Sequence, residues 1–189
     1  MNDAGGSFDR QRAEERASRV RHLILDVDGV LTDGRIVYTT SGEQVLSFHV
    51  HDGLGIKLLA SAGIAASIIT ARGSSALERR ARELGISSLY QGVGDKAAAL
   101  REISSRLGVH PSGMAAVGDD LVDLPILTKV GFSVAVANAQ PAIFPYVDFI
   151  TNRQGGAGAV REVCEFILRA KGLYDSAVEG YLRQDAPGP

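Results

Sequence analysis

The sequence has a single cysteine, little net charge and no long apolar run, and each of these absences excludes a class of protein. With only Cys164, no disulfide can form within the chain. The net charge of −2 argues against a general nucleic-acid-binding protein, which is usually clearly basic. No stretch reaches the ~20 apolar residues of a membrane span, and no apolar segment precedes Leu23. We therefore expect no nucleic-acid or membrane partner, no signal peptide and a cytoplasmic location.

The length and composition are those of one ordinary globular domain. The chain has 189 residues, of which 45% are apolar and 22% are charged. Residues 1–20 are polar and rich in Gly, Arg and Glu, which predicts a flexible N-terminal tail that can become helical near residues 13–18. We expect the domain to span residues 21–172, followed by a partly ordered C-terminal tail over 173–189.

Within this domain, apolar segments typical of strands alternate with amphipathic segments typical of helices. This alternation predicts an α/β fold with a doubly wound, mostly parallel sheet. The predicted strands cover residues 23–28, 64–70, 86–91, 114–118, 132–137 and 148–151. The predicted helices begin near Gly53, Ser74 and Asp95 and cover residues 121–129 and 160–170, with a short helical turn over 142–146.

A β-hairpin over residues 34–48 interrupts the alternation. Residues 35–40 and 44–50 are rich in β-branched and aromatic side chains, and they flank a turn at Ser41, Gly42 and Glu43. A projecting hairpin of this kind either covers a site or pairs with another subunit.

The first predicted strand carries two carboxylates at its end. The apolar run over residues 23–25 is typical of a buried parallel strand, and Asp26 and Asp28 follow it. In extended geometry these two side chains point to the same side. Buried carboxylates are costly unless a metal, hydrogen bonds or cations compensate them. A strand followed by an Asp-Gly turn at Gly29 is the simpler alternative, and the rest of the chain decides between them.

Further polar residues follow the other predicted strands. Because ligands bind at the carboxyl ends of the strands in open parallel sheets, we expect these side chains to share a site. Taken singly, the threonine could be a helix cap, the lysine a solvated side chain and the Gly-Asp-Asp segment a turn. Their occurrence at successive strand ends favours a site instead. The residues are Thr70 and Arg72 after the second strand, Lys96 after the third, and Asp119, Asp120 and Asp123 after the fourth.

This set of residue types indicates magnesium-dependent phosphoryl transfer. Carboxylate oxygens without nearby His or Cys suit Mg²⁺ better than zinc, and Mg²⁺ is usually partnered by phosphate oxygens. Thr70 and Lys96 supply a hydroxyl donor and a positive charge for the remaining phosphate oxygens. One carboxylate is then left to attack phosphorus and another to handle the proton. The sequence therefore predicts a reaction through an aspartyl-phosphate.

These residues resemble the four motifs of the haloacid dehalogenase superfamily, in order and spacing. The resemblance implies that Asp26 is the nucleophile, that Asp28 is the general acid and base, and that Thr70 and Lys96 are catalytic. It also implies that Mg²⁺ is held by the Asp26 carboxylate, the Asp28 backbone carbonyl and Asp119. Asp120 and Asp123 would assist indirectly or through water.

From about residue 21 to 172 the chain is similar to the 3-deoxy-D-manno-octulosonate 8-phosphate phosphatases, a branch without a cap domain. This resemblance implies hydrolysis of that sugar-acid phosphate in lipopolysaccharide precursor synthesis. Members are homotetramers whose hairpins assemble a central barrel, so a neighbouring subunit would help to close each site. The segments that carry the resemblance are the hairpin and residues 50–56, 90–92, 133–139 and 155–162.

The same resemblance implies a set of substrate contacts. Extra cations are expected because a sugar-acid phosphate carries a carboxylate as well as a phosphate. The chain departs from the family pattern at His51, where Arg or another polar residue is expected, and at Lys57, which replaces an Arg and lacks its bidentate fork. Arg80 follows Arg79 on a predicted helix and could alternatively be a solvated side chain. The implied contacts are Asp28, His49, Val50, His51, Asp52, Gly53, Lys57, Arg72, Arg80 and Lys96.

Two alternatives to this function stay open at the level of sequence. The substrate could be a nine-carbon sugar acid 9-phosphate. The chain could also be a non-catalytic tetramerisation module, because similar domains occur fused behind sugar-acid cytidylyltransferases. The complete catalytic set favours the enzyme.

Overall fold

The computed structural model describes residues 9–182 and contains a six-stranded sheet in which every strand pair is parallel. The strand order is β5-β4-β1-β6-β7-β8. The chain adds β4 and β5 on one side of β1, and then crosses to the other side to add β6, β7 and β8. All six strands coincide with predicted ones. They are β1 (His22–Leu25), β4 (Ala65–Ile69), β5 (Ser88–Tyr90), β6 (Met114–Gly118), β7 (Phe132–Ala135) and β8 (Phe149–Ile150).

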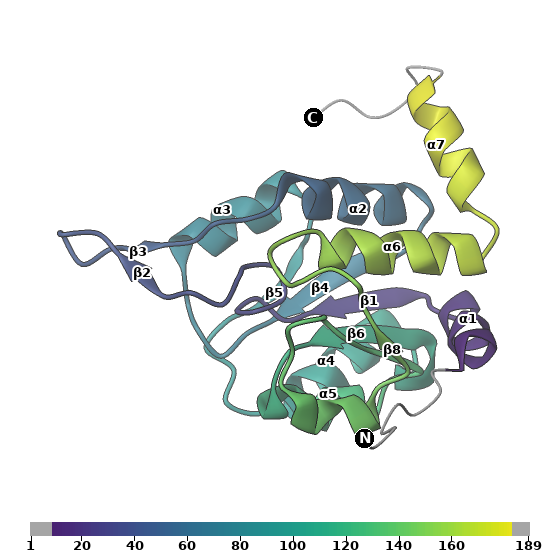
Figure 1. The fold of residues 1–189 in the computed structure, drawn as a ribbon. Helices are drawn as coiled ribbons and strands as arrows, with labels where there is room; N and C mark the ends of the chain where they lie inside the picture. Colours follow the sequence, from purple (N-terminus) through teal and green to yellow (C-terminus); the bar gives the residue numbers. More distant parts are fainter. Residues whose placement is uncertain (1–8, 183–189) are drawn as a thin grey trace, which may run out of the picture.

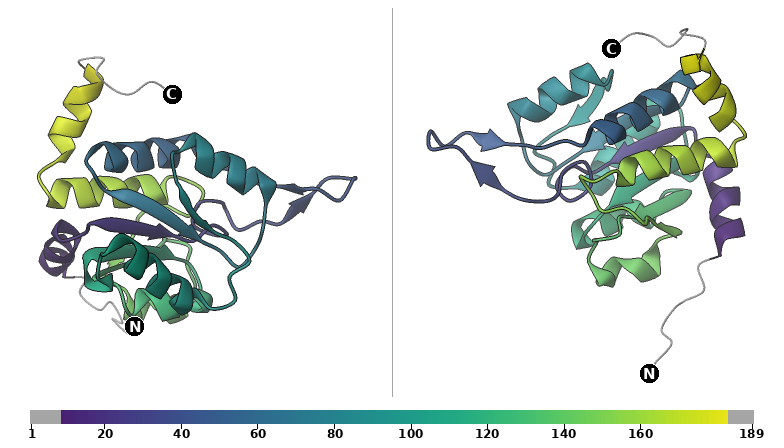
Figure 2. Two further views of the ribbon diagram at one scale, coloured as in Figure 1. Left: turned by 180° about the vertical axis from the view of Figure 1, so that it is seen from behind. Right: turned by 45° about the horizontal axis from the view of Figure 1, so that its top comes forward.

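Helices cover both faces of this sheet, which confirms the predicted doubly wound α/β fold (Figure 1). On one face lie α2 (Val50–Ser61), α3 (Ser75–Glu83) and α6 (Ala159–Ala170). On the other lie α4 (Lys96–Leu107) and α5 (Leu124–Leu127), and the view from behind shows the same two layers (Figure 2). Short 3₁₀ helices η1 (Pro111–Gly113), η2 (Leu121–Asp123) and η3 (Pro141–Tyr146) complete the connections.

Strand β1 lies at the centre of the core. It pairs with β4 through His22 and Ala65 and with β6 through His22 and Met114, and the register continues to Leu25. All four of its residues are buried, as expected for a strand that is covered on both faces. The strand ends at Leu25, one residue before the first carboxylate, so the sheet leads directly to the predicted site.

The hairpin is present and projects from the body of the molecule (Figure 1). Its strands β2 (Val37–Tyr38) and β3 (Gln44–Val45) are antiparallel and shorter than the predicted ranges. Gly42 takes a left-handed conformation in the turn, at φ 84°, which a side chain would disfavour. Most of its apolar side chains are exposed, unlike those of the six-stranded sheet.

The described part of the predicted N-terminal tail contains a helix that is longer than the helical stretch expected near residues 13–18. Helix α1 (Arg10–Ser18) forms there, capped by the Asp9 carboxylate, which accepts the Arg12 N–H at 3.0 Å. Ala13 and Ala17 are buried against the body. Two alanines in a polar segment give only a weak hydrophobic periodicity. The packing of this helix against the body could therefore not be predicted from the sequence. Residues 1–8 lie outside the described residues.

The other end of the chain forms helix α7 (Tyr174–Leu182), none of whose residues is buried. It extends away from the sheet (Figure 2). Residues 183–189 lie outside the described residues, and the boundary at residue 172 stays a prediction. Across residues 9–182, no helix combines the length and apolar character needed to cross a membrane.

Candidate active site

The side chains predicted to form the site come together at the carboxyl edge of the sheet. Asp26 directly follows β1, and its N–H donates to the carbonyl of Val117 on β6 at 3.2 Å. Thr70 follows β4 and Lys96 begins α4, while Asp119 follows β6. Asp26, Thr70 and Lys96 are buried. Parallel strands whose ends share one edge account for this convergence.

Lys96 joins two of the carboxylates. Its Nζ donates to Asp26 Oδ1 and to Asp123 Oδ1, each at 2.7 Å. Asp123 Oδ2 accepts the N–H groups of Asp119 at 3.0 Å and Asp120 at 3.4 Å. Asp123 therefore holds both Lys96 and the main chain at Asp119 and Asp120 in place. From the sequence, Asp123 was expected only to assist indirectly or through water.

The cluster is more negative than its single lysine can balance. Burial and the Asp123 carboxylate raise the pKa of Asp26 to about 6, although Lys96 opposes the shift. Burial and the carboxylates of Asp123, Asp26 and Asp120 raise the pKa of Asp119 to about 7. Burial opposes the charge on Lys96, but Asp123 and Asp26 outweigh it and raise the lysine pKa. A site with this excess of negative charge is suited to a cation.

Three carboxylates lie close enough to share one metal ion. Oxygens of Asp26, Asp119 and Asp123 are within 4.8 Å of one another. Hard oxygen donors of this kind fit Mg²⁺. Asp123 already accepts hydrogen bonds at both oxygens, which leaves Asp26 and Asp119 as the carboxylates with an oxygen available to a metal ion. The sequence also predicted that the main-chain carbonyl of Asp28 binds the metal. The distances between carboxylate oxygens do not test this contribution, which stays a prediction.

Two glycines allow the loop after β1 to sit beside Asp119. Gly29 has φ 85°, and a β-carbon there would collide with the Asp119 carboxylate. A β-carbon on Gly155 would collide with the carbonyl oxygen of Gly29. The loop is therefore held between Asp119 and the segment that precedes α6. The role of Gly155 was not predicted, and the glycine-rich run over residues 155–158 was its only signal.

Asp28 faces the more open part of the site. Arg72 Nε lies 3.8 Å from Asp28 Oδ2, and both side chains are about one-third exposed. The Arg72 N–H donates to Thr70 Oγ1 at 3.3 Å, so the loop after β4 brings this arginine to the carboxylate. This arrangement places an acid and a cation where a phosphate ester can reach them.

The predicted substrate segment forms the start of α2, three residues earlier than the helix was expected. His49 precedes the helix, and its ring lies edge-on to that of His51, with centroids 4.9 Å apart. Val50 is exposed, and Lys57 one turn beyond the segment is half-buried. Asp52 in the first turn suits the positive end of the helix dipole. Residues 49 and 50 were expected in the second arm of the hairpin, whereas the structure places Val50 in α2.

Asp52 itself is turned into the protein. Its Oδ1 accepts the Arg161 N–H at the start of α6 at 2.8 Å, and burial raises its pKa. Among the described residues, its Oδ2 and the Nδ1 of His49 are buried without a hydrogen-bond partner. Asp52 thus links α2 to α6, and its buried carboxylate gives no support to the predicted substrate contact.

Comparisons with known proteins place this chain in a family. A family model described as haloacid dehalogenase-like hydrolase matches residues 89–163. The 3-deoxy-D-manno-octulosonate 8-phosphate phosphatase of Escherichia coli strain K12 is 46% identical over 162 residues, which is 86% of each sequence. The chain belongs to the 3-deoxy-D-manno-octulosonate 8-phosphate phosphatase family.

Solved structures of this phosphatase family have the same fold. The enzyme from Yersinia pestis is 45% identical and superposes with a TM-score of 0.86 over 87% of this chain and 89% of its own. The structure from Moraxella catarrhalis is a complex with a magnesium ion, a phosphate ion and a KDO molecule. It is 41% identical and has a TM-score of 0.89 over 91% of this chain and 99% of its own. The predicted fold and family are confirmed.

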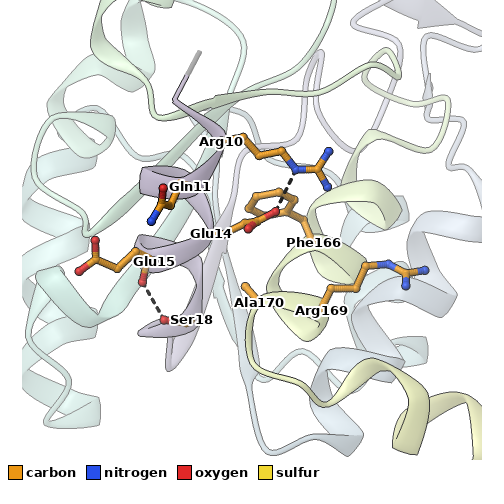
Figure 3. A pocket seen from close by; sticks show the side chains of 8 residues that line it. All are labelled: Arg10, Gln11, Glu14, Glu15, Ser18, Phe166, Arg169 and Ala170. Atoms are coloured by element: carbon orange, nitrogen blue, oxygen red, sulfur yellow. Dashed lines mark hydrogen bonds and ion pairs between the residues drawn. The ribbon is translucent and has the colours of Figure 1, made fainter. Parts of the chain in front are cut away.

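A pocket of about 480 Å³ lies away from the site that defines the phosphatase family (Figure 3). It is formed between α1 and α6, where β1 begins, whereas the carboxylates lie where β1 ends. An Arg10–Glu14 ion pair at 2.9 Å crosses part of its wall. The lining residues are Arg10, Gln11, Glu14, Glu15, Ser18, Phe166, Arg169 and Ala170. None of the candidate site residues lines this pocket.

Proposed function

We propose that this protein hydrolyses 3-deoxy-D-manno-octulosonate 8-phosphate to the free sugar acid and inorganic phosphate, in lipopolysaccharide precursor synthesis. The observation that carries the proposal is the Asp26–Lys96–Asp123 network beside Asp28 and Asp119. Family membership over 86% of the chain and the KDO-bound Moraxella catarrhalis relative support the choice of substrate.

The proposed reaction uses two carboxylates, those of Asp26 and Asp28. The Asp26 carboxylate attacks phosphorus, forming an Oδ–P bond as the bond from phosphorus to the sugar oxygen breaks. Asp28 gives its proton to that departing oxygen. It then takes a proton from a water molecule, which attacks the aspartyl-phosphate, releases phosphate and regenerates Asp26.

Two cationic or polar side chains support the attack. Lys96 is hydrogen-bonded to Asp26, so it orients the nucleophile and offsets negative charge. Thr70 is buried at the end of β4, where its hydroxyl can donate to a phosphate oxygen. Asp123 keeps Lys96 in place through the second hydrogen bond.

The donors fit Mg²⁺, with the Asp26 and Asp119 carboxylates and the Asp28 carbonyl as its protein ligands. When bound, Mg²⁺ would neutralise the crowded carboxylates and withdraw charge from the phosphate oxygens. The raised pKa values of Asp26 and Asp119 support this assignment, because they result from burial and from mutual repulsion of carboxylates.

The proposed contacts to the sugar acid come from residues beside Asp28 and from the start of α2. Arg72 lies beside Asp28 and is placed to bind the ester phosphate or a sugar oxygen. His49, Val50, His51 and Gly53 at the start of α2, together with Lys57, Arg80 and Lys96, complete the proposed contacts.

We extend the proposal to a homotetramer that acts in the cytoplasm. Tyr38 is 61% exposed and Ile36 55% exposed on the projecting hairpin, and exposed apolar groups of this kind favour contact with another subunit. Light scattering should give four times the chain mass, and Tyr38→Asp should lower it. Cell fractionation tests the location.

Phosphate release from the purified protein tests the activity directly. We expect the highest kcat/KM with the eight-carbon ester, loss of activity with a chelator and its return with Mg²⁺. Asp26→Asn should lower kcat by at least about 1,000-fold, because the nucleophile is removed while the shape is kept. A higher kcat/KM with a nine-carbon sugar acid 9-phosphate would instead assign the enzyme to that substrate.

A further inference from the structure

The segment that precedes α6 has no part in the proposed chemistry, yet it touches the loop that carries this chemistry. We call this segment, residues 152–158, the bracing loop. The N–H of Gly156 donates to the carbonyl of Val30 at 2.9 Å. A β-carbon on Gly155 would collide with the carbonyl oxygen of Gly29. The bracing loop therefore lies directly against the two residues that follow the proposed general acid.

The two proposed catalytic carboxylates are held differently. Asp26 is attached to the sheet, since its N–H donates to the carbonyl of Val117 on β6 at 3.2 Å. Beyond Asp26 the chain turns around the carbonyl of Val27, which accepts the N–H of Val30 at 3.2 Å. Asp28 lies within this turn, so its position depends on what holds the turn rather than on the sheet. The bracing loop supplies such a contact from outside.

A carboxylate of α6 gives the bracing loop its shape. Glu162 accepts four hydrogen bonds from the start of this loop. The N–H of Asn152 donates to both carboxylate oxygens at 3.0 and 3.1 Å, and Asn152 Nδ2 donates to Oε1 at 2.7 Å. The N–H of Arg153 donates to Oε2 at 3.0 Å. Further along, the N–H of Gly155 donates to Asn138 Oδ1 at 2.8 Å.

Glu162 acts from a part of α6 that is itself fixed to the body. The N–H of its neighbour Arg161 donates to Asp52 Oδ1 at 2.8 Å, which links the first turn of α6 to α2. A β-carbon on Gly55 of α2 would come within 2.9 Å of the Arg161 Cα, so the two helices are closely packed at this point. The Glu162 carboxylate therefore connects a packed pair of helices to the bracing loop.

We propose that Glu162 is a positioning residue that sets the place of Asp28 through the bracing loop. This inference rests on the proposed function and deepens it, because it assigns part of the catalytic geometry to a side chain outside the carboxyl-edge cluster. Without the four hydrogen bonds the loop loses its shape and Asp28 shifts, while Asp26 keeps its bond to β6. Proton transfer by Asp28 should therefore suffer more than attack by Asp26.

The dependence of the rate on the leaving group tests this division. Benzyl phosphate and p-nitrophenyl phosphate are similar in size, but only the first releases an alkoxide that needs a proton from Asp28. We expect Glu162→Ala to lower kcat/KM at least about 10-fold more for benzyl phosphate than for p-nitrophenyl phosphate. Glu162→Gln keeps one acceptor oxygen and should show a smaller difference. The eight-carbon ester should behave as benzyl phosphate does.

Glu165→Ala is the matched control on the same helix. The Glu165 carboxylate binds the side chains of Arg161 and Arg169, so its removal breaks ion pairs of α6 and leaves the bonds to the bracing loop in place. This variant should keep the wild-type ratio of kcat/KM between the two esters. Each variant is assayed at a temperature at which its circular dichroism is that of the folded protein.

Hydrogen exchange measured by mass spectrometry follows the brace itself and needs no substrate. Glu162→Ala should speed amide exchange at least about 5-fold in the bracing loop and also in residues 29–33, because the two segments support each other. Glu165→Ala should leave exchange in both segments at the wild-type rate.

The contrary outcomes separate this inference from the proposed function. Equal losses of kcat/KM on the two esters in Glu162→Ala, or faster exchange confined to the bracing loop, would overturn the role of Glu162. If the wild-type enzyme hydrolysed benzyl phosphate and not the eight-carbon ester, the proposed substrate would be wrong, and the same two measurements would still decide the role of Glu162. If it hydrolysed neither ester, the proposed function would fail, and this inference with it.

Discussion

The two edges of the sheet each carry an ion-paired carboxylate, part-buried at the amino edge and buried at the carboxyl edge, and the two are built differently. At the amino edge, Arg16 of α1 donates to both oxygens of Asp148 at 2.8 and 2.9 Å, and Ser133 donates to Asp148 Oδ2 from its N–H and hydroxyl at 3.0 Å each. One carboxylate there meets one guanidinium and two further donors. The charge is fully compensated.

At the carboxyl edge, a cluster of three carboxylates has one lysine, which binds two of them. The pKa of Asp26 and that of Asp119 rise to about 6 and about 7, because burial and mutual repulsion are not offset. The Arg16–Asp148 pair links helix α1 to the sheet. The carboxyl-edge cluster instead has an excess of negative charge, which suits it to bind a cation. The excess of negative charge is thus the property that distinguishes the candidate site from the amino-edge pair.

The largest effect is expected when the lysine is removed. Lys96→Met keeps the volume but leaves Asp26 and Asp123 buried without their cation, which should destabilise the protein by about 3–5 kcal/mol at pH 8. Urea unfolding in the absence of metal measures the change. The loss should shrink at pH 5, where Asp26 with its raised pKa is protonated. A loss that is equal at both values of pH would contradict the electrostatic explanation.

Magnesium should stabilise the carboxyl edge by a somewhat smaller amount. At 100 times its Kd, Mg²⁺ should add about 2.7 kcal/mol to the free energy of unfolding. The gain should be larger at pH 8 than at pH 6, because the ligands must lose their protons, and Asp119 has a pKa of about 7. Thermal unfolding with and without Mg²⁺ measures it. An undiminished gain in Asp119→Asn would place the metal elsewhere.

Breaking the amino-edge pair should affect stability alone. Arg16→Met should lower the free energy of unfolding by about 1.5 kcal/mol, because Asp148 keeps its two hydrogen bonds from Ser133 but loses the arginine. kcat/KM should equal that of the wild type. A clear loss of catalytic efficiency would show that the two edges are coupled and would weaken the comparison.

The smallest effect concerns a titratable group that the amino edge keeps neutral. His22 Nε2 lies 2.7 Å from Ser67 Oγ, and burial, with Arg106 nearby, lowers the pKa of His22 from 6.5 to about 4. Its neutral form stabilises the fold fully above pH 6.5, and that contribution is lost as the pH falls towards 4. Between pH 7 and 5.5 the loss should be about 1 kcal/mol. His22→Gln should remove this part of the pH dependence, and an unchanged slope would contradict it.

The sequence predicted the parts of the molecule that depend on local pattern. Asp26, Thr70, Lys96 and Asp119 could be assigned to one edge because parallel strands end together there. The strand order could not be predicted, because hydrophobic periodicity identifies strands without saying which of them pair. Helix α1 was expected only near residues 13–18, and its packing was not predicted, because only Ala13 and Ala17 are buried in a polar segment.

The details that depend on contacts between distant segments could not be predicted either. The buried Asp52 carboxylate meets the N–H of Arg161, 109 residues further along the chain. Nothing within the polar segment around Asp52 distinguishes such a link from a solvated carboxylate. The same holds for Gly53, whose lack of a side chain has a purpose only when Arg80 of α3 lies against it.

The contact between Gly155 and Gly29 has a consequence for biosynthesis. The ribosome makes Asp26 early, but the glycine that fits against the loop after β1 is made more than a hundred residues later. A nascent chain that ends before Gly155 has all the proposed catalytic side chains and lacks the segment that packs against this loop. We therefore expect the candidate site to be complete only after Gly155 has been made.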